Sequence, residues 1–131
     1  MRLSLRTMPR VLVVDDERSV RNALRKILER GGMTVIEAGS AQQAFEIVER
    51  GDAIDAVVSD VLMPEMSGLA LYDELLRRAP GLKGRVVFLT GAAQDPKVQG
   101  PIEQRGVPLI SKLSDLMLVL DAVRLALLRK A

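Results

Sequence analysis

The stretch Val57-Val58-Ser59-Asp60-Val61-Leu62-Met63-Pro64 constrains the fold more than any other part of the chain. It is a short, valine-rich apolar run that ends in an acidic residue and a Met-Pro turn, a pattern typical of a strand buried in a parallel sheet. Ligands of open α/β sheets bind beyond the carboxyl ends of the strands. The pattern therefore predicts that Asp60 lies at such an edge, although most aspartates in this position only cap the next turn.

Other apolar runs predict further strands, and helical patterns separate them. Strands are expected at 10–14, 33–38, 53–59, 85–89 and 107–110, and helices at about 17–30, 40–50, 67–79, 95–105 and 114–129. This alternation predicts an α/β fold, a (βα)5 parallel sheet with right-handed crossovers and helices on both faces. The helix between the last two strands contains Gly100-Pro101, and an internal proline costs roughly 3 kcal/mol. We expect that helix to be short, broken or displaced.

The composition limits the chemistry that the chain can perform. At 131 residues the chain is long enough for one domain with a hydrophobic core, and it contains no cysteine and no histidine. Thiol chemistry, disulfides, Cys/His zinc sites and a histidine base are therefore excluded. Carboxylates, hydroxyls, lysine and the backbone remain, and this set suits a hard cation such as Mg²⁺.

Five polar residues fall at the predicted carboxyl ends of four strands: Asp15 and Asp16, then Asp60, Thr90 and Lys112. A parallel sheet brings these ends to one edge, where three carboxylates repel one another unless a cation neutralises them. Lys112 and a Mg²⁺ ion would do so. A carboxylate nucleophile beside a hydroxyl, an ammonium group and a divalent metal makes an environment suited to phosphoryl transfer.

The motifs Val-Val-Asp15-Asp16-Glu17, Ser59-Asp60-Val-Leu-Met63-Pro64 with Gly68, Leu89-Thr90-Gly91 and Ser111-Lys112 are together highly specific. In them the chain resembles the CheY-like receiver domains of response regulators in two-component signalling, over roughly residues 9–130. The resemblance implies a doubly wound, flavodoxin-like sheet in the order 2-1-3-4-5. It also implies that Asp60 is the phosphoacceptor, that Thr90 and Lys112 contact the phosphoryl group, and that Mg²⁺ is the cofactor. Asp16, Asp60 and the backbone carbonyl of Leu62 would bind the metal directly, and Asp15 largely through water.

The resemblance further implies partners and a cellular setting. A histidine kinase or phosphotransfer protein would donate the phosphoryl group, as in a phosphorelay, and the domain would catalyse only its own phosphorylation and dephosphorylation. We expect a loose leader at 1–8, a receiver domain at 9–131, a cytoplasmic location, no membrane span and no DNA-binding or enzymatic effector domain. The domain either stands alone or belongs to a larger protein such as a hybrid sensor kinase. The alternative function is a pseudo-receiver that acts only as an interaction module.

Two positions depart from the family's pattern. Leu109 stands where receivers usually carry an aromatic residue that turns inward with the threonine, so the usual transmission of phosphorylation is in doubt. Leu113 replaces the usual cis-proline, and a cis bond without proline costs about 3 kcal/mol. We therefore predict a trans Lys112–Leu113 bond. With Gly100-Pro101, these departures place an unusual output face beside an intact reaction centre.

The last helix contains the run Leu116-Met117-Leu118-Val119-Leu120, which is apolar at five consecutive positions and cannot all face the sheet. Met117 and Leu118 are candidates for an exposed patch. Such a patch would serve as a homodimer or partner-domain contact, whereas additional core packing is the equally weighted alternative.

Overall fold

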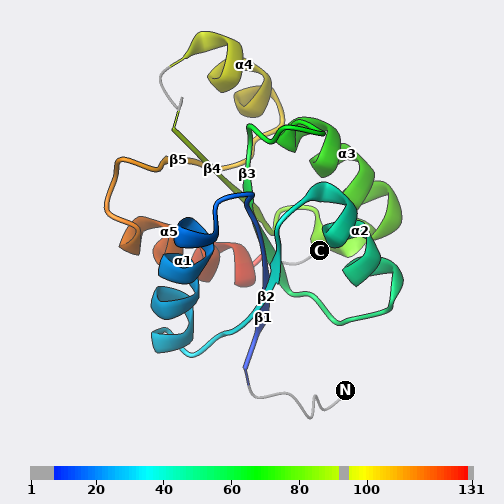
Figure 1. The fold of residues 1–131 in the computed structure, drawn as a ribbon, viewed down its shortest axis with the longest axis vertical. Helices are drawn as coiled ribbons and strands as arrows, with labels where there is room; N and C mark the ends of the chain where they lie inside the picture. The colour runs from blue at the N-terminus through cyan, green and yellow to red at the C-terminus, as the bar shows by residue number, and fades with distance from the viewer. Residues whose placement is uncertain (1–7, 92–94, 130–131) are drawn as a thin grey trace.

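The computed structural model describes residues 8–91 and 95–129, which form a five-stranded parallel sheet between two layers of helices (Figure 1). The strands are β1 (Arg10–Val14), β2 (Thr34–Ala38), β3 (Ala56–Asp60), β4 (Val86–Thr90) and β5 (Leu109–Ser111). The helices are α1 (Arg18–Arg30), α2 (Ala41–Glu49), α3 (Gly68–Arg78), α4 (Pro96–Gln104) and α5 (Met117–Leu127), with a 3₁₀ turn η1 at Pro80–Leu82. The strand order β2-β1-β3-β4-β5 confirms the predicted α/β fold class.

The sheet is buried on both faces because its strands are apolar without interruption. In β1, Leu12 and Val14 face the cluster that includes α2, α3 and α4, whereas Val11 and Val13 face the cluster that includes α1 and α5. The same alternation continues in β3 and β4, whose side chains are all buried. A parallel sheet covered in this way delivers its polar strand ends to one edge.

The helix boundaries follow local capping groups. The Oγ atom of Ser40 accepts a hydrogen bond from the Gln43 amide at 3.2 Å, which confirms the predicted start of α2. The predicted start of the last helix at Ser114 is too early. Asp115 Oδ1 accepts a hydrogen bond from the Met117 amide at 2.9 Å, so regular helix begins only at Met117.

The expectation that the fourth helix would be short, broken or displaced is met in its first form: α4 is short, with 9 residues, but it is continuous through Pro101. The Asp95 side chain caps its first turn by accepting from the Lys97 amide at 3.0 Å. Val98 and Ile102 are buried in the core cluster on the α3 side of the sheet. Packing of this face therefore offsets the hydrogen bond that the proline cannot donate.

The structure also describes the two positions that depart from the family's pattern. The described residues contain no cis peptide bond, so the Lys112–Leu113 bond is trans as predicted. Leu109 is half-buried in β5, where it pairs in register with Phe88 and packs against the same core cluster as α4. The expected leader lies, apart from the exposed Met8, outside the described residues.

Candidate functional site

The structure brings the predicted polar residues together at the carboxyl edge of the sheet. Asp60 and Thr90 end β3 and β4, Asp15 and Asp16 follow β1, and Lys112 follows β5. Asp15, Asp60 and Thr90 are almost fully buried, with exposed fractions of 1%, 4% and 0%. Asp16 is exposed at the rim. The convergence predicted from the strand ends is therefore present.

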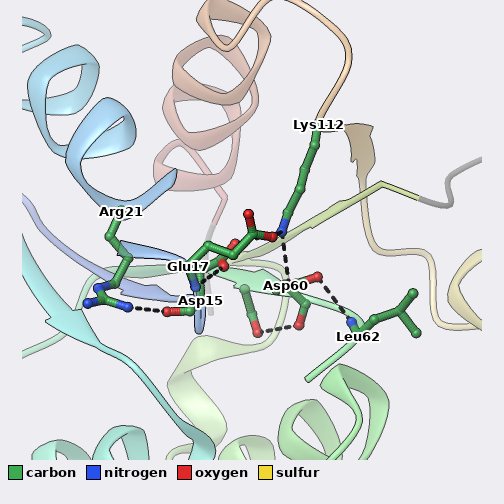
Figure 2. Close-up of polar contacts among 7 residues, drawn as sticks. Asp15, Glu17, Arg21, Asp60, Leu62 and Lys112 are labelled. Atoms are coloured by element: carbon green, nitrogen blue, oxygen red, sulfur yellow. Dashed lines mark hydrogen bonds and ion pairs between the residues drawn. The ribbon is translucent and has the colours of Figure 1, made fainter. Parts of the chain in front are cut away.

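Lys112 holds the site together by contacting three carboxylates at once. Its Nζ atom lies 3.0 Å from Asp60 Oδ2, 3.1 Å from Asp15 Oδ2 and 2.9 Å from Glu17 Oε1 (Figure 2). Burial alone lowers the pKa of the Lys112 ammonium, but the contacts with Glu17, Asp60 and Asp15 outweigh burial and raise it. The lysine is thus held as a cation by the three acids that it contacts.

The two oxygens of the Asp15 carboxylate are held in different ways. Its Oδ1 atom accepts a hydrogen bond from the Glu17 amide at 2.9 Å. Its Oδ2 atom is buried and accepts no hydrogen bond, since the approach of Lys112 is within range but outside hydrogen-bond geometry. Burial and the nearby charge of Asp60 raise the pKa of Asp15 above its usual value. Because Oδ2 faces the Lys112 charge without receiving a hydrogen bond, its lone pairs also suit a metal ion.

The Asp60 side chain is fixed by its own turn. Oδ1 accepts a hydrogen bond from the Leu62 amide at 3.0 Å, and Oδ2 faces Lys112 (Figure 2). The amide of Gly68 donates to the Val61 carbonyl at 2.6 Å, which folds the β3–α3 loop back onto the strand end. A Cβ atom on Gly68 would lie 2.5 Å from the Asp60 carbonyl oxygen. Glycine is therefore required there for the backbone to approach Asp60.

The acidic residues form a cluster whose chemistry suits Mg²⁺. One carboxylate oxygen from each of Asp15, Asp16, Glu17 and Asp60 lies within 4.8 Å of the others. Oxygen ligands of this kind are those that Mg²⁺ prefers, and Asp15, whose buried Oδ2 receives no hydrogen bond, belongs to the same group. The residues present therefore fit the metal that the sequence predicts.

Two residues of the site were not predicted from the sequence. Glu17 contacts Lys112, and its position directly after the aspartate pair was the available signal. Arg21 on α1 donates from its guanidinium to the Asp15 carbonyl at 2.6 Å and to Glu37 Oε1 on β2 at 3.0 Å. Glu37 also accepts from Arg25 Nε at 2.8 Å. Arg21 falls within the helix predicted at about 17–30, and no motif singled it out.

The fold and the site together define a receiver domain. The family model of the response regulator receiver domain matches residues 11–124, and the chain belongs to this family. Receiver domains are phosphoacceptors that exchange phosphoryl groups with histidine kinases or phosphotransfer proteins. No helix in the two described segments is both long and apolar enough to cross a membrane.

Similar sequences occur in much longer signalling proteins. The chain is 45% identical over 86 residues to the sensor kinase CckA of Brucella abortus, covering 65% of this chain and 9% of that protein. It is 34% identical over 104 residues to the C4-dicarboxylate transport transcriptional regulatory protein DctD of Rhizobium meliloti, covering 79% of this chain and 22% of that protein. The chain therefore spans less than a quarter of either relative.

Solved receiver structures share the fold. A CheY-like receiver domain from Methanospirillum hungatei superimposes with a TM-score of 0.81 at 24% identity, covering 92% of this chain and 94% of that chain. The response regulator TrrA from Thermotoga maritima, solved in complex with Mg²⁺ and BeF, gives a TM-score of 0.77 at 24% identity, covering 91% and 99%. These likenesses concern the fold.

Proposed function

We propose that this chain is an active receiver in which Asp60 accepts a phosphoryl group from a phosphohistidine in a Mg²⁺-dependent reaction. The observation that carries the proposal is the triple contact of Lys112 with Asp60, Asp15 and Glu17 at a buried strand edge. A carboxylate that is only structural does not need a lysine and a cluster of further acids around it.

In the proposed reaction, a carboxylate oxygen of Asp60 attacks the phosphorus atom of the donor. The new O–P bond forms as the P–N bond to the donor imidazole breaks, and the imidazole nitrogen keeps the electron pair and takes up a proton. The Leu62 amide orients Asp60 through Oδ1. Lys112 pairs with an oxygen of the arriving phosphoryl group, and the Thr90 hydroxyl donates to another.

Mg²⁺ would supply charge neutralisation for the phosphoryl oxygens when bound. Asp16 at the exposed rim and the buried Asp60 would hold it with the Leu62 backbone carbonyl, and Asp15 would act largely through a bound water. Glu17 lies in the same cluster, although its contact with Lys112 directs it toward the lysine.

Incubation with acetyl phosphate and Mg²⁺, followed by intact-protein mass spectrometry, tests the proposal. We expect one added phosphoryl group on the wild-type chain and none on Asp60→Asn. Asp95→Asn is a matched control, because asparagine also caps a helix and the position is remote from the site. Equal labelling of Asp60→Asn would show that another residue is the acceptor.

The same experiment separates the pseudo-receiver alternative. Binding of BeF₃⁻ in the presence of Mg²⁺ is measured in addition by ¹⁹F NMR. A folded wild-type chain that neither accepts a phosphoryl group from acetyl phosphate nor binds BeF₃⁻ would be an interaction module without phosphoryl chemistry. The complete acidic site and its lysine favour an active receiver. For the donor, we propose a histidine kinase or phosphotransfer protein, and phosphotransfer profiling with Asp60→Asn as control identifies it.

A further inference from the structure

A second polar pocket lies at the edge of the sheet opposite to Asp60. It has a volume of about 150 Å³ and lies where β4 and β5 begin, beside Val86 and the segment 106–108. Strand β4 runs from Val86 at this edge to Thr90 at the other, so roughly 13 Å of strand separate the pocket from the candidate phosphorylation site. A ligand in the pocket would therefore not touch the residues of that site.

Three basic side chains line the pocket, and none of the described residues that line it is acidic. Lys83 precedes β4, Arg105 follows α4 and Arg129 follows α5. Arg105 bridges to Asp73 on α3 at 3.0 Å, which offsets one of the three positive charges. Neither Lys83 nor Arg129 forms an ion pair with another residue in the described part of the chain. The pocket therefore keeps two positive charges that a ligand can neutralise.

The wall of the pocket also carries a hydroxyl group. Tyr72 on α3 is 6% exposed, and its ring packs against Phe88 of β4 with the ring centres 5.8 Å apart. Its hydroxyl makes no hydrogen bond to any residue that the structure describes. Burial and the charge of Asp73 raise the pKa of Tyr72, and Arg105 acts against them, so the phenol stays protonated near neutral pH. It can therefore donate a hydrogen bond to an anion beside Arg105.

The last part of the described chain brings Arg129 to the pocket. Helix α5 exposes Met117 and Leu118 near its start, as predicted, and the segment after its other end reaches the amino edge of the sheet. There the guanidinium of Arg85 donates to the Arg129 backbone carbonyl at 2.8 Å. The Arg129 side chain passes close to Gly84, where a Cβ atom would lie 3.5 Å from Arg129 Cδ. These two contacts hold Arg129 at the rim of the pocket.

We infer that this pocket binds a small dianion of the phosphate type, either free phosphate or the phosphate group of a small monoester. The two remaining positive charges match the charge of a phosphate monoester above about pH 6. Arginine supplies a fork of donors and lysine a point charge, the two means by which proteins bind phosphate. The apolar side chains of Val86, Val107 and Pro108 line the remaining wall and suit a short carbon chain. A volume of about 150 Å³ is below the roughly 300–1,000 Å³ of pockets for larger ligands, so the ligand is small.

Titration with inorganic phosphate in EDTA, at about pH 8 and constant ionic strength, tests the inference. Tyr72 is the only tyrosine of the chain, which contains no tryptophan, so its fluorescence reports binding within the pocket. We expect a saturable change with a Kd below about 1 mM, and acetate, a monoanion, is expected to bind at least about tenfold more weakly. Glycerol 3-phosphate separates the two sources of phosphate. Tighter binding than that of inorganic phosphate assigns the pocket to a monoester, and weaker binding assigns it to the free ion.

Substitutions in the lining separate the pocket from general attraction by a basic surface. Lys83→Met and Arg129→Met each remove one cation and are expected to weaken phosphate binding at least about tenfold, equivalent to about 1.4 kcal/mol. Tyr72→Phe keeps the ring and removes the hydroxyl, and calorimetry should show binding about threefold weaker. Lys97→Met on α4 and Arg124→Met on α5 are matched controls, because they remove exposed cations outside the pocket and are expected to leave binding unchanged.

This inference goes beyond the phosphoacceptor function and does not depend on it. Asp60→Asn is expected to bind inorganic phosphate like the wild type, so a failed phosphorylation test leaves this result standing. Circular dichroism and thermal unfolding establish that each variant is folded. The inference would be overturned by a wild-type chain without saturable phosphate binding, by acetate binding as tightly as phosphate, or by equal losses in the pocket and control variants.

Discussion

Lys112 and Asp60 stand 52 positions apart in the sequence, and their side chains meet at 3.0 Å beyond the carboxyl ends of two strands. The strand β4 separates β3 from β5 in the sheet, so the lysine reaches across the end of β4 to the acid. The same ammonium contacts Asp15, which makes Lys112 the shared counter-charge of two buried carboxylates that would otherwise repel each other.

Replacing Lys112 with methionine is expected to lower the free energy of unfolding by about 3 kcal/mol in EDTA, because buried carboxylates lose their cation. Added Mg²⁺ should then stabilise this variant more than it stabilises the wild type, since a ligand of the folded state raises stability by mass action. Chemical denaturation with and without Mg²⁺ measures both effects. Lys97→Met, at an exposed lysine without a side-chain partner in the described segments, is the control. If Mg²⁺ raised the free energy of unfolding equally in the wild type and the variant, Lys112 would not be the shared counter-charge of the two carboxylates.

Alanine at position 68 is expected to destabilise the domain by about 1–3 kcal/mol. The new Cβ would meet the Asp60 carbonyl oxygen, at the end of β3, and the Val61 Cα directly after it. Backbone atoms at these positions cannot give way as a flexible side chain can. Gly100→Ala is the matched comparison, because a Cβ there meets nothing within 4 Å and the position lies inside α4. That change should raise stability by roughly 0.5–1 kcal/mol. Thermal unfolding of the two variants should show a loss of stability for Gly68→Ala and a gain for Gly100→Ala. Equal losses of stability in both would show that the close approach at Gly68 does not require glycine.

Glu37 gives the fold a pH-dependent contribution to stability. Burial alone raises the pKa of its carboxyl, but the hydrogen bonds and charges of Arg25 and Arg21 outweigh burial and lower it below 4.5. A depressed pKa means that the contribution is complete above the unfolded-state pKa and is lost as the pH falls through the folded-state value. We expect Glu37→Gln to cost about 1 kcal/mol at pH 7 and progressively less below about pH 4.5. Denaturation of both proteins from about pH 7 to about pH 3 should show the difference closing, and a difference that stays constant would rule out this linkage.

Arg21 is expected to act as a positioning residue for the acidic cluster of Asp15, Asp16, Glu17 and Asp60. Its guanidinium binds the Asp15 carbonyl, so Arg21→Met should loosen the loop that presents Asp15 and Asp16. We expect Mg²⁺ affinity, measured by calorimetry, to fall about tenfold, the size of effect seen when groups behind metal ligands are removed. Arg25→Met is a close control, because Arg25 pairs with Glu37 but does not contact Asp15. Similar losses in the two variants would assign the effect to the shared Glu37 contact instead.

The site could be predicted from the sequence because each of its main residues directly follows or ends an apolar run. In a parallel sheet the carboxyl ends of all strands lie at one edge, so residues that follow different strands come close together in space. The sequence is therefore enough to group Asp15, Asp60, Thr90 and Lys112. The role of Arg21 could not be predicted in this way. Its contact with Asp15 depends on how α1 is rotated against β2, and helical spacing gives no information about a hydrogen bond to a loop carbonyl.

The fourth helix shows a case in which a local rule is right only in part, because α4 is short but not broken. Gly100 and Pro101 both disfavour the helix interior, yet α4 is continuous because Val98 and Ile102 are anchored in the core. Arg105 adds a bridge from the end of α4 to Asp73 on α3 at 3.0 Å. Contacts of this kind join residues far apart in the sequence, so they cannot be predicted from the residues of the helix alone.

Because Lys112 follows β5, the candidate site is complete only when the whole sheet has formed. β5 has only three residues and pairs with β4 alone, at the edge of the sheet. A nascent or truncated chain that ends before β5 carries the acids of β1 and β3 without their counter-charge. On the proposed function, such a chain would present uncompensated carboxylates to a phosphodonor, so we expect phosphoryl transfer to begin only once the last strand has docked.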